Sequence, residues 1–337
     1  MSDQIRWGIL GTAKIARNFL IPALQASSLN TISAVGSRDP ERGKAFAAEI
    51  GPDVRAFGSY EAMLDDPDID AVYNPLPNHL HVPLTLEAAK RGKHVLCEKP
   101  IGLSHADAAA LREVPPDINV MEAFMVRFHP QWLEVRRRVQ SGDLGTVRAI
   151  QAFFSYYNDD PSNIRNQVDI GGGGIMDIGC YPMLIGRFLF DANPLRAVSL
   201  IQRDLSFGTD NLASAILDFG EDRQLSFMVS TQAVPHQRVS VVGTSGRIDV
   251  MIPFNAPTNQ ETALRLDRGA ALGDAKSETI TIAPTDQYEQ QVDAFARAIQ
   301  SGSPAPYGVE DALANMAVLD AIFRSEVTHA WVEIDYS

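Results

Sequence analysis

Residues 5–16 read IRWGILGTAKIA, an apolar run followed by a turn of small residues and the start of a helical pattern. A short apolar run bounded by a turn is typical of a buried strand. Where a strand passes through a tight turn into a helix, the first helical N–H groups and the helix dipole favour a bound pyrophosphate. The stretch therefore predicts a dinucleotide site near the start of the chain.

The glycine pattern of this stretch departs from the usual dinucleotide fingerprint, which carries three glycines. The pattern here is Gly11-x-Ala13-x-x-Ala16, so only the glycine of the tight turn is kept. Ala13 would hold the phosphates slightly further from the backbone, whereas Ala16 still allows the helix to pack closely on the sheet. Alone, the pattern is also compatible with an ordinary strand–turn–helix unit.

The chain shows two successive patterns of predicted secondary structure. We expect strands at 5–10, 31–35, 55–57, 70–73, 94–97 and 119–123, alternating with helices, and then strands at 146–154, 213–219, 224–230, 238–243 and 246–250 with few helices between them. Helices return at 288–300 and 310–324. The predicted fold is α/β, with a Rossmann doubly wound parallel sheet over 1–123. An α+β domain over 124–337 follows, with a large open, mostly antiparallel sheet.

The end of the second predicted strand bears on the choice of cofactor. In a nucleotide-binding sheet this end faces the adenosine ribose, where an acidic residue favours NAD(H) and an arginine accommodates the 2′-phosphate of NADP(H). Ser37 and Arg38 occupy this place, with Arg42 one turn further on, although Asp39 is also close. A hydroxyl and a planar guanidinium suit a phosphate, so we expect NADP(H) rather than NAD(H).

Composition and charge exclude several classes of protein. The 337 residues carry 42 acidic and 29 basic side chains, a formal charge of −13 that repels nucleic acid. An anionic cofactor must therefore meet a local basic patch. The two cysteines, Cys97 and Cys180, have no metal-ligand spacing and indicate buried thiols in a reducing cytosol. No leader or membrane-length apolar run is evident, and we expect a cytoplasmic protein without a membrane partner.

Two loops follow predicted strands and should face the ligand crevice, because ligands of parallel sheets bind at the carboxyl ends of the strands. The first is the proline-broken segment 74–81, whose His79 and His81 lack a third ligand, so we expect no metal. The second is Glu98-Lys99-Pro100, which follows an apolar strand directly. Both charges of this pair should project into the crevice.

A glycine run at 171–174 leads directly into an apolar helix, unlike a flexible linker. Asp177 and Tyr181 lie four residues apart and should share one face of that helix. An aspartate that only caps its own helix is the alternative. Residues 156–166, which precede the run, are expected to form an irregular loop.

These segments together resemble the glucose–fructose oxidoreductase/inositol 2-dehydrogenase (Gfo/Idh/MocA) superfamily over essentially the whole chain. The matching segments are GILGTAKIA at 8–16, PLPNHLH at 75–81, EKP at 98–100, MEAFMVRFHP at 121–130, and GGG at 172–174 before DIGCY at 177–181. Within the superfamily the chain is most similar to sugar and dihydrodiol dehydrogenases with tyrosine at the end of the last motif. Many relatives have histidine there, so a histidine-based mechanism does not carry over.

The resemblance, with the positions argued above, implies a set of site residues. The cofactor set is Gly11, Thr12, Ala13, Lys14, Ile15, Ser37, Arg38, Arg42, Pro75, Leu76, Asn78, His81, Glu98, Lys99 and Arg127. The implied catalytic residues are Lys99, Tyr181 and Asp177, and these three with Arg165 form the implied substrate set. A lysine and a phenol both titrate near pH ~10 when unperturbed, so either requires a shifted pKa, and the choice between them stays open.

The resemblance implies an NADP(H)-dependent oxidoreductase that oxidises the anomeric hydroxyl of a cyclic aldose, such as D-xylose or glucose, to a lactone. A cofactor that stays bound and shuttles hydride between two sugars is one variant. Alternatives are a trans-dihydrodiol or other cyclic polyol or carbonyl oxidoreductase, and a regulator that binds the dinucleotide without chemistry. Because family members pair through the open sheet, a homodimer or homotetramer is also expected.

Overall fold

The computed structural model describes residues 4–269 and 276–337, which form two compact units. Of these residues, the first unit comprises 4–125 and 288–313, and the second comprises 126–269, 276–287 and 314–337. The predicted boundary at 123/124 lies two residues before this division. Residues 288–313, which the prediction places in the second domain, belong to the first unit.

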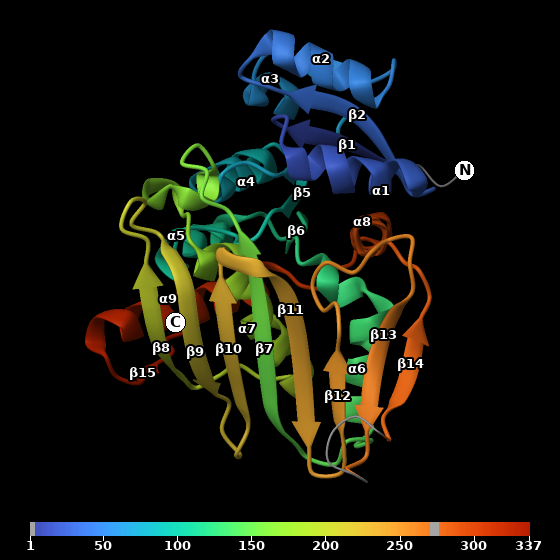
Figure 1. The fold of residues 1–337 in the computed structure, drawn as a ribbon. Coiled ribbons are helices and arrows are strands. Elements are labelled where there is room, and N and C mark those ends of the chain that lie inside the picture. Colours follow the sequence, from blue (N-terminus) through green and yellow to red (C-terminus); the bar gives the residue numbers. More distant parts are fainter. Residues whose placement is uncertain (1–3, 270–275) are drawn as a thin grey trace. The chain divides into compact units, whose positions relative to one another are not determined.

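The first unit is built on a six-stranded parallel sheet in the order β3-β2-β1-β4-β5-β6 (Figure 1). Its strands are β1 (Ile5–Leu10), β2 (Asn30–Gly36), β3 (Arg55–Phe57), β4 (Ala71–Asn74), β5 (His94–Cys97) and β6 (Val120–Glu122). Its helices include α1 (Ile21–Ala26), α2 (Pro40–Ile50), α3 (Tyr60–Leu64), α4 (His81–Lys90), α5 (His105–Ala108) and α8 (Gln287–Ser301). The predicted doubly wound sheet is confirmed, and β1 and β4 lie side by side where the strand order reverses.

The Trp7 side chain explains why α8, so distant in sequence, belongs to this unit. Its indole is fully buried and donates to the Asn30 side-chain oxygen at 2.7 Å. The ring also packs on Phe295 of α8, with centroids 5.8 Å apart. At the end of α1, the Ser27 hydroxyl donates to the Asp293 carboxylate of the same helix at 2.5 Å.

The second unit contains a nine-stranded sheet in the order β14-β13-β12-β11-β7-β10-β9-β8-β15. The strands are β7 (Val147–Tyr157), β8 (Arg196–Arg203), β9 (Asp210–Asp218), β10 (Gln224–Ser230), β11 (Gln232–Gly243), β12 (Arg247–Val250), β13 (Thr262–Asp267), β14 (Glu278–Ile282) and β15 (Val332–Glu333). Neighbours are antiparallel except β7 and β10, which run parallel. The predicted large, mostly antiparallel sheet is confirmed.

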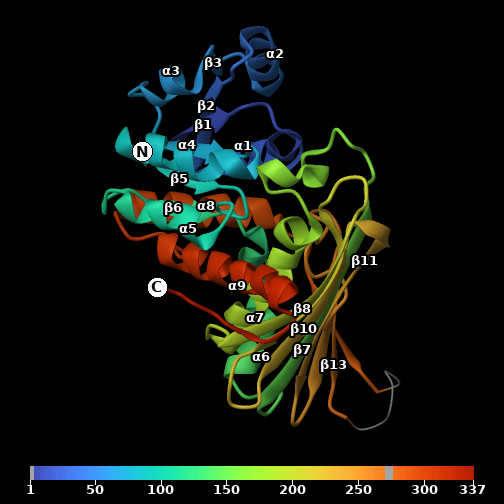
Figure 2. The ribbon, with the colours of Figure 1, turned by 90° about the vertical axis from the view of Figure 1, so that its left-hand side faces the viewer.

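One face of this sheet is covered by helices. Figure 2 shows α6 (Pro130–Gln140), α7 (Cys180–Phe190) and α9 (Val309–Thr328) on the same side of the strands. Ser199 of β8 is fixed to α9, because its N–H donates to the Ser325 hydroxyl at 2.9 Å and its own hydroxyl donates to the Ile322 carbonyl at 2.7 Å.

The expectation that residues 156–166 form an irregular loop is wrong at its start. Strand β7 continues through Tyr157, which pairs with Gln232 across a register shift in β11. Pairing with β11 keeps Tyr156 in the sheet, whereas the polar run Asn158-Asp159-Asp160 ends the strand.

Candidate active site

The turn after β1 has the geometry that a phosphate site requires. Gly11 has a positive φ of 76°, and a Cβ there would lie 2.8 Å from the Leu76 side chain, so only glycine fits. Its N–H donates to the Gly36 carbonyl at 2.7 Å, which ties the turn to the end of β2. Helical structure runs without a break over 14–26, and its first N–H groups belong to this turn.

The end of β2 presents two exposed guanidinium groups. Within the described part of the chain, no hydrogen bond or ion pair holds the side chains of Arg38 and Arg42. The carboxylate of Asp39 is occupied, because it caps α2 by accepting the N–H groups of Glu41 and Arg42, both at 3.1 Å. The acidic residue near this strand end is therefore used by the helix, and the arginines are available to an anion.

The loops after β4 and β5 are joined through the His81 side chain. The ring is buried, with Nδ1 lying 2.7 Å from the Pro100 carbonyl oxygen and Nε2 lying 2.6 Å from the Leu76 carbonyl oxygen. Burial lowers the pKa of His81 to about 4, and the Lys99 ammonium acts in the same direction. The neutral ring carries one N–H and donates to only one of these two carbonyl groups, but it packs between the two predicted cofactor loops, and Lys99 lies within electrostatic reach of it.

Glu98 is held in place by the buried phenol of Tyr73. The hydroxyl of Tyr73, in β4, donates to the Glu98 carboxylate at 2.5 Å. Burial and this carboxylate raise the pKa of Tyr73 well above its usual value, so the phenol stays protonated and keeps donating. The pair fixes the direction of Glu98, while Lys99, next to it, is half-buried and joined to Pro100 by a cis peptide bond.

In the second unit, Asp177 is the centre of a three-residue cluster. Its Oδ2 atom accepts from the Arg165 guanidinium at 2.8 Å and from the Tyr156 hydroxyl at 2.6 Å. The carboxylate is 12% exposed and the guanidinium 43% exposed. Burial, reinforced by Asp177, raises the pKa of Tyr156 far above its usual range, so this phenol acts only as a proton-bearing donor.

Tyr181 lies near this cluster and in an aromatic group. Asp177 lies in the π-helical turn η7 (Ile175–Gly179), which continues directly into α7, where Tyr181 is the second residue. The Tyr181 phenol contributes to raising the pKa of Arg165. Its ring packs on Phe254 and Phe154, with centroids 5.5 Å and 6.0 Å apart, and these two stack on each other at 4.8 Å.

The structure thus brings the predicted residues together in two separate sets. In the first unit, the turn after β1, the end of β2 and the loops after β4 and β5 all follow carboxyl ends of parallel strands. In the second unit, Arg165, Asp177 and Tyr181 converge, and Arg127 is buried in the 3-10 turn Met125–Phe128. Tyr156 was missed because its segment was expected to be a loop.

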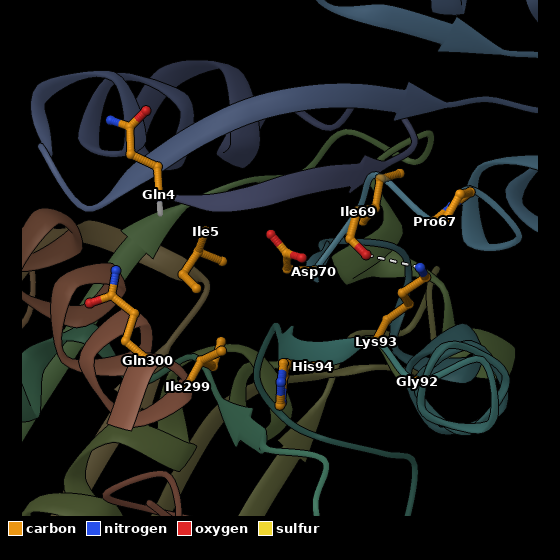
Figure 3. Close-up of a pocket in the computed structure, with 10 residues that line it drawn as sticks. All are labelled: Gln4, Ile5, Pro67, Ile69, Asp70, Gly92, Lys93, His94, Ile299 and Gln300. Atoms are coloured by element: carbon orange, nitrogen blue, oxygen red, sulfur yellow. Dashed lines mark hydrogen bonds between the residues drawn. The ribbon is translucent and has the colours of Figure 1, made fainter. Parts of the chain in front are cut away.

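A pocket at the opposite, amino ends of β1, β4 and β5 has a different character (Figure 3). Gln4, Ile5, Pro67, Ile69, Asp70, Gly92, Lys93, His94, Ile299 and Gln300 line it. The Lys93 ammonium donates to the carbonyl oxygens of Asp66 and Ile69 at 2.7 Å and 2.9 Å, and Asp70 is held by Arg6 at 2.7 Å. Because the protein occupies these charges itself, the pocket is not a second candidate for the active site.

Among the residues that the structure describes, no group of three or more histidine, cysteine, aspartate or glutamate side chains could hold a metal ion. Within the same residues, every helix is too short or too polar to cross a membrane.

Comparison with known proteins identifies the class to which this fold and site belong. The profile of the oxidoreductase family with an NAD-binding Rossmann fold matches residues 5–119, and that of the GFO/IDH/MocA C-terminal domain matches 132–249. The chain is 43% identical over 331 residues to an uncharacterized oxidoreductase of Rhizobium meliloti, covering 98% of this chain and 99% of the relative. It is 38% identical over 334 residues to D-xylose 1-dehydrogenase (NADP(+)) 2 of Haloferax volcanii, with the same coverage.

A solved structure agrees with these relatives. A 3-ketoreductase from Actinomadura kijaniata, in complex with NADP and TDP-benzene, superposes with a TM-score of 0.87 at 29% identity. The alignment covers 96% of this chain and 98% of that one. The chain belongs to the Gfo/Idh/MocA family of oxidoreductases.

The hydrogen bond from Tyr156 to Asp177 yields a stability prediction. Tyr156→Phe should lower the free energy of unfolding by about 1–3 kcal/mol, because a half-buried carboxylate loses a donor. Urea denaturation measures this change. The matched control is Tyr157→Phe, whose ring is 62% exposed and whose hydroxyl donates at 3.2 Å to the exposed Asp159. Equal losses of unfolding free energy in the two variants would contradict a stabilising role for the hydrogen bond from Tyr156 to Asp177.

Proposed function

We propose that this chain is an NADP(H)-dependent oxidoreductase that transfers hydride between the nicotinamide and a cyclic sugar. The favoured substrate is an aldose such as D-xylose or glucose, oxidised at its anomeric hydroxyl to the lactone. The relationship to the Haloferax volcanii D-xylose 1-dehydrogenase (NADP(+)) 2 supports this substrate class and cofactor.

The Asp177 cluster is the observation that carries the proposal. A partly exposed carboxylate beside a guanidinium and two phenols offers acceptors and donors at short range. A sugar presents neighbouring hydroxyl groups that both donate and accept, and such a group of side chains can bind two of them at once. In this proposal Asp177 and Arg165 orient the substrate, and Tyr156 keeps the carboxylate in place.

The cofactor residues fit an NADP dinucleotide. The Gly11 turn and the N–H groups that follow it suit the pyrophosphate, and Ser37, Arg38 and Arg42 suit the 2′-phosphate. The turn continues through Thr12, Ala13, Lys14 and Ile15. The loop after β4 contributes Pro75, Leu76 and Asn78. We assign Glu98 and Arg127 to the nicotinamide ribose. His81 acts indirectly, since both ring nitrogens already face carbonyl oxygens.

The bound nicotinamide supplies the hydride acceptor, and the protein handles the proton. When the C1–H hydride leaves the sugar, the hydroxyl proton must pass to a base as the C=O bond forms. The proposed acceptor is either Lys99 as the neutral amine or Tyr181 as the phenolate, because an ammonium or an intact phenol cannot take up this proton. If Tyr181 is the acceptor, the role of the Lys99 ammonium is to favour the phenolate by its charge and to polarise the substrate oxygen.

The function is tested by mixing the purified protein with NADP and a panel of aldoses, polyols and dihydrodiols while following nicotinamide absorbance. Turnover is expected with at least one aldose. Tight cofactor binding with a flat trace for every substrate would favour a non-catalytic regulator. Turnover of dihydrodiols alone would move the substrate assignment to that alternative. Nicotinamide absorbance of the protein as purified would reveal a permanently bound cofactor.

Lys99→Met should abolish turnover and leave NADPH binding within about a few-fold of the wild type. Methionine keeps most of the side-chain volume but removes the ammonium that polarises the substrate oxygen or exchanges its proton. Stopped-flow turnover and fluorescence titration with NADPH provide the two measurements. Lys90→Met, at the exposed end of α4, is the control and should keep wild-type activity. Residual turnover near the wild-type rate in Lys99→Met would exclude Lys99 from the chemistry.

Arg38→Ala should weaken NADPH binding by about ten- to hundredfold, the contribution of a charge-assisted contact to phosphate. NADH binding, which involves no 2′-phosphate, should change little. Isothermal titration with both cofactors gives the ratio. The control is Lys44→Ala on the same helical region, because the Lys44 ammonium is already paired with Glu41 at 3.0 Å. Equal effects on both cofactors would remove Arg38 from the 2′-phosphate site.

We infer that the uncovered face of the nine-stranded sheet pairs with a second copy of the chain. Leu200 in β8, Leu212 and Ile216 in β9 and Met228 in β10 are exposed, while most of the alternate residues of β9 and β10 are buried. A contiguous apolar face of this kind favours association.

Replacing Ile216 and Met228 together by lysine should therefore yield monomers, because two charges would be desolvated at each interface. Sedimentation velocity measures the outcome. Val327→Lys is the control, since Val327 is exposed apolar surface on α9 rather than on the sheet. A monomeric wild-type protein would overturn the inference.

A further inference from the structure

Asp210, the first residue of β9, is a carboxylate that neither the motifs nor the proposed chemistry uses. It is only 2% exposed. Its Oδ2 atom accepts the backbone N–H of Ile175 at 2.6 Å. Ile175 is the first residue of η7, so a buried negative charge lies at the amino end of the helical segment that carries Asp177 and Tyr181. The N–H groups at such an end favour an ionised carboxylate.

The glycine run is shaped to receive this carboxylate. Gly173 has a φ of 122°, and a Cβ on it would lie 2.0 Å from Asp210 Oδ1. A Cβ on Gly174 would lie 3.2 Å from Oδ2. Asp210 therefore occupies the space that a side chain at 173 would need, and the absence of a side chain lets the carboxylate reach the helix end.

The contact is transmitted to the predicted active-site residues through the backbone. The Gly173 carbonyl accepts the N–H of Asp177 at 3.0 Å. Asp210 thus holds Ile175 through a hydrogen bond and packs against Gly173, whose carbonyl bonds to Asp177. A shift of this helix end would change how Asp177 meets Arg165 and Tyr156, and would move Tyr181, which lies one turn further along.

The groups around Asp210 shift its pKa in opposite directions. Burial raises its pKa to about 6, against the Ile175 N–H and the Arg203 guanidinium, which lower it. Arg203, in β8, is itself paired with Glu326 of α9 at 2.6 Å, and the Glu326 charge raises the Asp210 pKa further. On β7, Tyr156 also feels the charge of Asp210. Arg203, Glu326 and Tyr156 are thus the charged or titratable neighbours from three other elements.

The raised pKa of Asp210 means that its ionised form lowers the stability of the fold, so stability alone does not account for this carboxylate. Because the folded pKa lies above the unfolded value, the associated stability is present at acid pH and is lost as pH rises through about 6. Above that pH the fold therefore retains an ionised carboxylate at a cost in stability. An asparagine at 210 keeps the side-chain shape and avoids this cost, but its neutral amide oxygen accepts the Ile175 N–H more weakly than a carboxylate does.

We propose that Asp210 is a positioning residue, whose ionised carboxylate sets the alignment of Asp177 and Tyr181 by holding the Ile175 N–H and the glycine run. The proposal rests on the proposed function only for the assignment of those two residues to the active site. It assigns Asp210 no contact with substrate or cofactor.

The kinetic test compares Asp210→Asn with the wild type between about pH 5 and about pH 8, on either side of the Asp210 pKa. At the upper end kcat should fall by about ten- to hundredfold, as expected for misaligned reacting groups, while the thermal midpoint stays equal or rises. At the lower end the two proteins should converge, because the wild-type carboxyl is then protonated. Asp218→Asn, at the other end of β9, is the control. A ratio of rates that does not vary with pH would overturn the proposal.

Arg203→Gln tests the same claim with Asp210 intact, should the first variant fold poorly. Removing the guanidinium raises the pKa of Asp210 further, so the acid limb of the pH–rate profile should move to higher pH. An unmoved acid limb would contradict the proposal.

Hydrogen exchange separates failure of this proposal from failure of the proposed function. Backbone amides over 173–181 should exchange faster in Asp210→Asn than in the wild type at about pH 8, and equally at about pH 5 after correction for intrinsic rates. This result with no turnover of any sugar would refute the function and retain the positioning role. Turnover with identical exchange in the two proteins would do the reverse.

Discussion

The parallel hydrogen bonding of β1, β2, β4 and β5 is the constraint on which the first unit depends. Parallel strands direct their carboxyl ends to one edge, so four loops that are distant in sequence share that edge. The loops at that edge are fixed by contacts within the protein. Gly11 is held to β2, the buried His81 ring packs between the carbonyl groups of two loops, and Tyr73 in β4 orients Glu98. Buried, neutral side chains thus position the half-buried Glu98 and the loop that carries Lys99.

The second unit solves a different problem, since it keeps carboxylates partly or wholly out of water. Asp177 is stabilised by a guanidinium and a phenol, which offset the loss of hydration. Asp210 has a backbone N–H and a more distant guanidinium, and its raised pKa reflects the weaker compensation. Groups retained at such a cost are common at functional sites. The two aspartates lie at the two ends of one short segment, 173–177, which couples them.

The parallel sheet was predictable, because most of its strands are short apolar runs followed by a turn signal; the short, exposed β3 (Arg55–Phe57) was expected from its place in the strand–helix alternation. The motif residues of both units were also predictable, as their order and spacing resemble one family. Tyr156 and Asp210 were not. Tyr156 is the penultimate residue of β7, and the polar residues that follow the strand suggest a loop. Asp210 stands 35 residues from its partner Ile175, and only the pairing of β8, β9 and β10 brings it to the glycine run.

Local charge, rather than the net charge of −13, decides how this protein meets an anionic cofactor. Over most of the surface basic side chains are paired, as Arg137 is with Glu134 and Arg203 with Glu326, so they add little attraction for an anion. The end of β2 differs, because its carboxylate is spent on capping α2 while its guanidinium groups stay exposed. The same cap that begins α2 therefore removes the acidic competitor of a 2′-phosphate. In the proposed site Asp39 thus begins one helix, and the choice between the two cofactors falls to Ser37, Arg38 and Arg42.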